Sequence, residues 1–279
     1  MKPNFTFSLI VFLCIASCKE DYEVVPYVVN IEDATIYDYS SKNLLFSVSN
    51  TKKVYFSKGN LQYQASTNMW RFAEHQYDYN GDYIATNSSI TTEDKWIDLF
   101  GYGTSGYDGK YPYMNNSNSG DYYTSDIFGT NYDWGVYNRI SNGGNKPGLW
   151  RTLTYDEWNY LLFKRKNANE KKKQTTIGDI YGWVLLPDNW EKPKRVSLSS
   201  TLTIREWKKL EDSGAVFLPY NRYIEYWTGS INPDDEVKWP YSIYLRDSYI
   251  EIRNRFYGEK LAVRLVCDAD KCDVLKLVK

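Results

Sequence analysis

Short runs of alternating apolar and polar residues dominate the chain from Leu45 onward. Runs of this kind are "LLFSVS", "KKVYFSKGNLQYQ", "GWVLLP", "GAVFLP", "EYWTGS", "YSIYLRDSYIEIRNRF" and "LAVRLV". Their two-residue period is typical of half-buried strands, and turn residues such as Lys-Gly-Asn separate them. The pattern therefore predicts many short strands.

Three stretches have a helical period instead: residues 91–101, 154–166 and 203–214. In the second and third, a threonine stands three residues before a glutamate, the spacing of a capping box, and an apolar stripe follows. In the first, Thr91 stands three residues before Asp94, ahead of an apolar face and a terminating glycine. We expect amphipathic helices that pack against a sheet.

Between the predicted helices the chain is rich in loops, above all at residues 102–131, where Gly, Asn, Ser and Tyr dominate. Loops of this length inside a compact domain are usually functional or disordered. A few helices, many short strands and long loops indicate an α+β domain with an irregular, twisted sheet. The chain has no repeat of 20 to 50 residues, which excludes a solenoid or propeller.

The N-terminus has the pattern of an export signal. Lys2 supplies a positive charge, and the apolar run from Phe5 to Ile15 is too short to span a bilayer. The run ends in "IASC", so residues 1–17 are a predicted signal peptide, 18–44 a tether and 45–279 the folded domain. We expect no transmembrane helix in the mature chain.

The string Ile15-Ala16-Ser17-Cys18 resembles the lipobox of bacterial lipoproteins, in which the cysteine thiol receives a diacylglycerol. Lys19, Glu20 and Asp21 follow, and this resembles the surface-export signal of Bacteroidetes lipoproteins. The resemblance implies a lipid anchor at Cys18 and a place on the outer face of the outer membrane. The alternatives are an ordinary signal peptide with an incidental cysteine, and the periplasmic face.

Composition narrows the classes of partner. The formal charge is −1, from 34 basic and 35 acidic residues, which does not favour binding to nucleic acid. Aromatic residues reach 17 %, with 27 Tyr and 10 Trp, many beside Asn, Ser and Gly. Such rings suit exposed contact surfaces, although they also pack in Tyr-rich β proteins.

Two cysteines remain in the domain, Cys267 and Cys272. In an exported protein this spacing predicts a local disulfide around "CDADKC". A zinc site would need more ligands nearby, and a catalytic thiol would need a base, whereas the single histidine, His75, is distant in the sequence.

Two acidic turns are weak candidates for calcium. "DYNGD" places Asp78, Asn80 and Asp82 at alternate positions, and "NPDDE" at 232–236 is a second acidic turn. The first lacks the closing glutamate of a complete calcium loop. A polar turn is the preferred interpretation of both, and we expect no cofactor apart from this calcium alternative.

Several segments together resemble one family. "GLWRTLTYDEWNYLL" is similar to the central helix of the formylglycine-generating-enzyme branch of C-type lectin-like domains, and "LAVRLV" to its closing strand. "GWVLLPDNW", "LEDSGAVFLPYNRY" and "YWTGS" resemble Bacteroidetes relatives with domains of the Fibrobacter succinogenes major paralogous type. The resemblance covers about residues 45–267 and implies a C-type lectin-like fold.

The functional residues of that branch do not carry over. Its sulfatase-activating enzymes use a cysteine pair ahead of the closing strand, whereas Cys267 and Cys272 follow it. One histidine cannot supply the His cluster of the related iron oxidases, and the calcium-coordinating motifs of sugar-binding lectins do not occur. These departures favour a protein that is not an enzyme, although a carboxylate pair for glycoside hydrolysis could still meet in the fold.

The segment "YSIYLRDSYIEIRNRF" has the composition of a binding surface. Strand alternation would point Tyr244, Arg246, Ser248 and Ile250 to one side. The predicted ligand-binding residues are Tyr244, Arg246, Asp247, Tyr249, Glu251, Arg253, Asn254, Arg255 and Tyr257. An ordinary amphipathic hairpin is the competing interpretation.

Three functions follow. The first is a surface-anchored, non-catalytic recognition lipoprotein that binds a glycan or protein through this segment and the Tyr-rich loops. The second is an exported enzyme-like member of the same branch, with a reactive thiol or a metal. The third is a structural or fimbria-like surface component.

Overall fold

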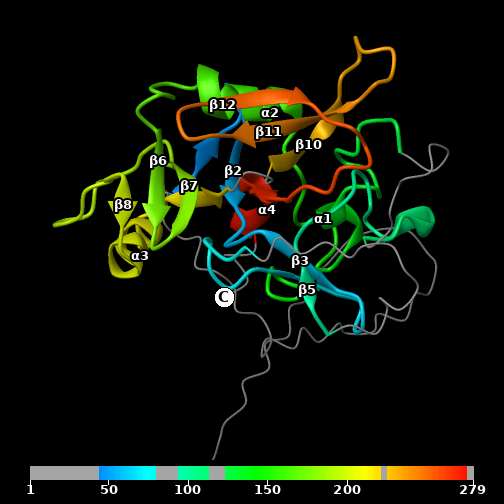
Figure 1. Ribbon diagram of the computed structural model, residues 1–279, viewed down its shortest axis with the longest axis horizontal. Helices are drawn as coiled ribbons and strands as arrows, with labels where there is room; N and C mark the ends of the chain where they lie inside the picture. The colour runs from blue at the N-terminus through cyan, green and yellow to red at the C-terminus, as the bar shows by residue number, and fades with distance from the viewer. Residues whose placement is uncertain (1–43, 80–93, 113–122, 221–224, 275–279) are drawn as a thin grey trace, which may run out of the picture. The chain divides into compact units, whose positions relative to one another are not determined.

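A computed structural model of the chain describes residues 44–79, 94–112, 123–220 and 225–274 (Figure 1). These residues form a mixed α+β fold with four small sheets. The predicted signal peptide, the lipidation site at Cys18 and the export signal Lys19, Glu20 and Asp21 lie outside the described residues. Within the described part, no helix has the length and apolar character needed to cross a membrane.

Two three-stranded sheets come from the first third of the chain and its end. One has the order β1-β2-β13, and the other has the order β4-β3-β5. The strands are β1 (Phe46–Ser47), β2 (Lys53–Phe56), β3 (Leu61–Gln64), β4 (Met69–Phe72), β5 (Trp96–Ile97) and β13 (Val266–Asp268). The predicted strands on either side of the Lys-Gly-Asn turn are present, but they pair with different neighbours.

The other two sheets come from the C-terminal half. One has the order β8-β6-β7-β9, with β6 and β8 parallel, and the other is the antiparallel sheet β10-β11-β12. The strands are β6 (Lys172–Ile177), β7 (Ile180–Leu185), β8 (Thr201–Leu202), β9 (Val216–Pro219), β10 (Glu225–Ile231), β11 (Pro240–Leu245) and β12 (Ile250–Asn254). In Figure 1, β11 and β12 lie on the opposite side of the view from β3 and β5.

The helices are short. They are η4 (Tyr107–Gly109, a 3-10 turn), α1 (Trp134–Tyr137), α2 (Tyr155–Asn159), its π-helical continuation η5 (Tyr160–Lys164), α3 (Ile204–Asp212) and α4 (Ala269–Val274). Both predicted capping boxes are confirmed, with reciprocal hydrogen bonds between Thr154 and Glu157 and between Thr203 and Glu206. Gly214 has a φ of +96°, a left-handed conformation that ends α3 at low cost.

The predicted helix over residues 91–101 is wrong in its described part. Trp96 and Ile97 form β5 and pair with Gln64 and Tyr63 of β3, and Phe100 forms a further antiparallel bridge to Leu261. Long-range pairing that buries Ile97 and Phe100 therefore outweighs the local helical pattern.

Of the predicted strand "LAVRLV", only Val266 belongs to a regular strand, as the first residue of β13. The backbone of this segment instead exchanges hydrogen bonds with several separate segments, among them Phe100, Arg151 and Glu225. All of its residues, 261–266, are at most 2 % exposed. This segment is thus a buried connector that joins the small sheets.

Three apolar clusters hold the sheets together. One is an aromatic cluster around Trp70, Trp134 and Trp150, and another packs α3 through Trp207 onto β6, β7 and β9. The third lies beneath the β11–β12 hairpin and combines Ile243, Leu245 and Ile250 with Trp158 and Leu161. One side of the hairpin is therefore fixed to the core.

Candidate ligand-binding face

The β11–β12 hairpin presents one apolar and one polar side. Leu245 pairs with Ile250 and Ile243 with Ile252, and the backbone N–H of Arg246 donates to the Tyr249 carbonyl at 3.0 Å to close the turn. On the polar side, Tyr244 lies opposite Glu251, and Ser242 lies opposite Arg253.

The alternation predicted across residues 244–251 is wrong. It placed Ile250 on the side of Tyr244, whereas Ile250 is buried in the core on the other side. The reason is the turn at Arg246–Tyr249, which interrupts the two-residue period and resets the side on which each later residue points. Tyr244 therefore shares its side with Glu251 and Arg253.

Glu225, at the start of β10, organises the polar side. Its side chain is 3 % exposed and accepts hydrogen bonds from the Ser242 Oγ at 2.6 Å, from Arg253 and from Arg255. The Arg255 Nε lies 2.9 Å from both carboxylate oxygens, and its Nη2 donates as well. Burial alone would raise the pKa of Glu225, but hydrogen bonds from Arg255, Arg253 and Ser242 outweigh burial and lower it.

Tyr244 forms a platform beside this carboxylate. The guanidinium carbon of Arg253 lies 3.4 Å from the centre of the Tyr244 ring, and that of Arg246 lies 4.5 Å from it. Arg246 also donates from Nε to the Tyr244 hydroxyl. The ring of Tyr249 lies 6.1 Å away and is 49 % exposed. Cation–π stacking of this kind holds the guanidinium planes in fixed positions.

Six predicted residues are thus brought together, and we call them the hairpin face: Tyr244, Arg246, Tyr249, Glu251, Arg253 and Arg255. Tyr244 is buried and supports the others, whereas Glu251 and Tyr249 are exposed.

The side chains of the other three predicted residues form hydrogen bonds with neighbouring parts of the fold. Asp247 accepts from the Tyr220 hydroxyl at 2.6 Å, and Asn254 donates to the Asp235 carboxylate at 3.2 Å. Tyr257 is 3 % exposed and donates from its hydroxyl to the backbone carbonyls of the β10–β11 loop. Its assignment to a binding face is corrected, because its ring belongs to the aromatic core.

Glu225 was missed from the sequence. The signal that could have found it is a glutamate in the otherwise apolar and neutral string "EYWTGS", ahead of a hairpin that carries several arginines. A buried charge in a strand requires a partner, and cross-strand arginines are the partners available here.

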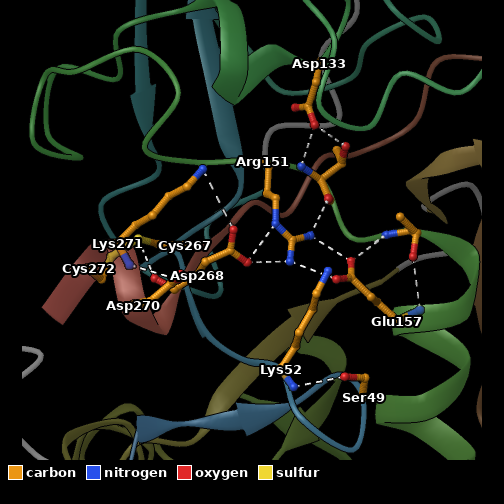
Figure 2. Close-up of polar contacts among 12 residues, drawn as sticks. Ser49, Lys52, Asp133, Arg151, Glu157, Cys267, Asp268, Asp270, Lys271 and Cys272 are labelled. Atoms are coloured by element: carbon orange, nitrogen blue, oxygen red, sulfur yellow. Dashed lines mark hydrogen bonds and ion pairs between the residues drawn. A yellow bond between two sulfur atoms is a disulfide. The ribbon is translucent and has the colours of Figure 1, made fainter.

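A second arginine–carboxylate cluster lies inside the molecule and is drawn in Figure 2. Arg151 donates to the Glu157 oxygens at 2.7 and 2.8 Å, to Asp268 at 2.9 and 2.6 Å, and to the Thr152 carbonyl at 3.1 Å. We call Arg151, Glu157 and Asp268 the Arg151 cluster. Burial alone would lower the pKa of Arg151, but hydrogen bonds with Asp268 and Glu157 raise it.

The disulfide and a buried carboxylate support this cluster. Cys267 and Cys272 are joined across a Cα–Cα distance of 6.1 Å, and the loop that they close contains Asp268. Asp133 is fully buried and accepts from the backbone N–H and the hydroxyl of Thr152, at 2.9 and 2.6 Å. Burial raises the pKa of Asp133 to about 6, although hydrogen bonds from Thr152 and Gly135 offset part of that effect.

A cleft of about 390 Å³ lies beside the Arg151 cluster, between Ser49 and Lys52 on one side and Glu157, Tyr160 and Lys164 on the other. Figure 2 shows the Lys52 side chain extending toward Glu157. Both Glu157 oxygens accept from Arg151, and one also accepts from the Thr154 N–H. The Glu157 carboxylate is therefore held by hydrogen bonds within the fold and is poorly placed to exchange protons with a molecule in the cleft.

The acidic turns proposed for calcium have internal hydrogen bonds where they are described. Asp78 accepts from the His75 backbone N–H at 2.8 Å, while Asn80 and Asp82 lie outside the described residues. Asp235 accepts from the Val237 N–H and from Asn254. Over the described ranges, no group of three or more His, Cys, Asp or Glu side chains is placed to hold a metal ion.

Comparison of the chain with protein-family models, with curated proteins and with solved structures found no match.

Proposed function

We propose that the chain is a surface-anchored, non-catalytic recognition lipoprotein with a C-type lectin-like domain of the formylglycine-generating-enzyme branch. Its ligand is a glycan or a protein, which binds at the hairpin face. Cys18 carries the lipid, and Lys19, Glu20 and Asp21 direct the protein to the outer surface of the outer membrane.

The main support for this proposal is that the arginine side chains of the hairpin face are held in fixed positions. Arg253 and Arg255 are fixed on one buried carboxylate, and Arg253 and Arg246 contact one tyrosine ring. Free arginine side chains lose about 2 kcal/mol of rotamer entropy when a ligand orders them. Here the fold has already ordered them, which is the feature expected of a binding surface.

Two further observations support a non-catalytic role. Cys267 and Cys272 are joined to each other, so neither presents a free thiol while the disulfide is intact. Glu157, which faces the cleft, is held by Arg151 and by the helix cap. Thiol titration and metal analysis of the purified chain test the enzyme-like alternative. A reactive cysteine, or stoichiometric copper or iron, would favour that alternative.

Binding is tested with glycan and protein arrays probed with the full chain. The double variant Arg246→Gln/Arg253→Gln should lose binding, and Arg205→Gln on α3 is the matched control because Arg205 is exposed and far along the chain from the hairpin. Unchanged binding by the double variant would remove the hairpin face from the proposal. Polymerisation without any soluble ligand would favour the structural alternative.

The anchor is tested in cells. Cys18→Ala should abolish incorporation of labelled palmitate. Replacing Lys19, Glu20 and Asp21 with Ala should leave lipid incorporation intact but protect the chain from protease added outside the cell. Full protease sensitivity in the triple variant would contradict the export role of these residues.

A further inference from the structure

The guanidinium groups of the hairpin face have more hydrogen-bond donors than the fold uses. Each guanidinium carries five N–H groups. Arg253 and Arg255 donate to Glu225 from Nε and Nη2 alone, and Arg246 donates to Tyr244 from Nε alone. The Nη1 groups of Arg253 and Arg255 and both Nη groups of Arg246 therefore have no acceptor in the described part of the chain.

These unused donors are partly exposed and fixed in place. The side chains of Arg253 and Arg255 are 29 % and 32 % exposed, whereas that of Glu225, which holds them, is 3 % exposed. The four hydrogen-bonding positions of the Glu225 carboxylate are already occupied by Ser242 and the two arginines. No acceptor among the described residues satisfies the rest, which leaves them for water or a ligand.

We infer that the hairpin face recognises an acidic glycan, with a carboxylate or sulfate group of the sugar bound by Arg246 and Arg253. A carboxylate presents two coplanar oxygens and a sulfate presents a cluster of oxygens, and both arrangements match the fork of guanidinium N–H donors. This inference depends on the proposed recognition function and narrows its ligand class.

The exposed surface favours a glycan over a protein. Protein interfaces are enriched in aromatic side chains, Met and Arg at their centres, where Asp, Glu and Lys are depleted, so the exposed Glu251 does not suit such a centre. On the hairpin face, Tyr249 is the one large side chain with high exposure, and its neighbours are Arg246, Glu251 and Arg253. One exposed ring beside charged donors and an acceptor suits a sugar, whose C–H face can lie on the ring while its polar groups are hydrogen-bonded.

Two carboxylates near the hairpin face, Glu251 and Glu259, should repel a bound anionic group, and this repulsion can be tested. Glu251 is exposed opposite Tyr244 and has no ion pair among the described residues. Hydrogen bonds to Glu225 are the main cause that raises the pKa of Arg255, and the charge of Glu259 raises it further. Removal of the exposed Glu251 charge should therefore strengthen the binding of an acidic sugar, whereas it should not strengthen the binding of a neutral one.

The test is an array of oligosaccharides that carry uronic acid, sialic acid or sulfate, each beside its neutral counterpart made by carboxyl reduction or desulfation. The full chain should bind acidic members at least about tenfold more tightly than their neutral counterparts, because each charge-assisted contact is worth about one order of magnitude in affinity. Arg246→Gln and Arg253→Gln should each weaken that binding about tenfold, Glu251→Gln should strengthen it two- to fivefold, roughly the effect of one exposed charge, and Arg205→Gln should leave it unchanged.

The arms of the array separate carboxylate from sulfate recognition. Equal binding of acidic and neutral members, still lost in Arg253→Gln, would overturn the inference and leave the proposed function standing. Binding of poly-glutamate or a protein at this face, with no glycan bound, would do the same. An array without any binding, together with no protein ligand sensitive to Arg253, would overturn both.

Discussion

Around Arg151, two carboxylates surround one guanidinium, whereas around Glu225 two guanidiniums share one carboxylate. All five N–H donors of Arg151 have acceptors within the chain, and its side chain is 7 % exposed. Arg253 and Arg255 each use two of five, and about a third of each side chain is exposed. The same pair of residue types therefore serves two purposes. The Arg151 cluster is satisfied internally and stabilises the fold, whereas we propose that the hairpin face keeps its remaining donors for a ligand.

The largest loss of stability should come from removing Arg151. Arg151→Ala leaves Glu157 and Asp268 without their partner and should lower the free energy of unfolding by about 3–5 kcal/mol. The measurement is urea denaturation of the purified full chain, with Arg205→Ala as the exposed control. A loss below about 1 kcal/mol would contradict a structural role for the Arg151 cluster.

The buried carboxylate beside this cluster should make stability depend on pH. The pKa of Asp133 rises from 3.8 to about 6 on folding, so between pH 4 and pH 6 the folded chain retains a proton that the unfolded chain releases. The contribution of Asp133 to the free energy of unfolding should therefore fall by about 3 kcal/mol as the pH rises through that window.

Asp133→Asn should lack this slope, because an amide does not ionise. The comparison is the difference between wild-type and variant unfolding free energies at pH 4 and at pH 6.5. A difference that does not change between the two pH values would show that Asp133 ionises equally in the folded and unfolded chains.

The disulfide should have a smaller effect, again on stability and not on binding. It closes a loop with a sequence separation of 5 residues, and loss of so short a constraint costs about 2 kcal/mol by loop entropy. Cys267→Ser/Cys272→Ser should lower the unfolding midpoint in urea while ligand affinity stays within about twofold, a change of under 1 kcal/mol. Reduction of the disulfide in the wild-type chain should lower the unfolding midpoint by the same amount. A large loss of ligand affinity in a double variant that is still fully folded would contradict this prediction.

The smallest effect on stability should come from the hairpin face itself. Arg253→Gln leaves Glu225 with Arg255 and Ser242, so the free energy of unfolding should fall by about 1 kcal/mol or less. Thermal or urea unfolding beside the Arg205→Gln control measures this. A loss comparable to that of Arg151→Ala would mean that the two clusters do not differ in role.

The features predictable from the sequence are those set within a few residues. The capping boxes at Thr154 and Thr203 belong to this class because both partners lie three residues apart on one turn. The helix predicted over 91–101 fails because β5 pairs with β3, more than 30 residues earlier in the chain. Local pattern carries no information about such a partner.

The candidate site follows the same rule. Most of its residues could be predicted from the composition of the hairpin, but their sides could not, because a four-residue turn at Arg246 resets the alternation. Glu225 lies 28 residues before Arg253, and Asp268 lies 117 residues after Arg151. Neither pairing has a local signature, and only the fold brings these charges together.

We propose that the hairpin face binds the ligand and that the Arg151 cluster stabilises the fold. The most direct test of this proposal is ligand affinity measured beside unfolding free energy in one double variant, Arg246→Gln/Arg253→Gln, of the full chain. We expect the affinity for the array-identified ligand to fall at least about tenfold, while the unfolding free energy stays within about 1 kcal/mol of wild type. Unchanged affinity in a fully folded double variant would contradict the proposal.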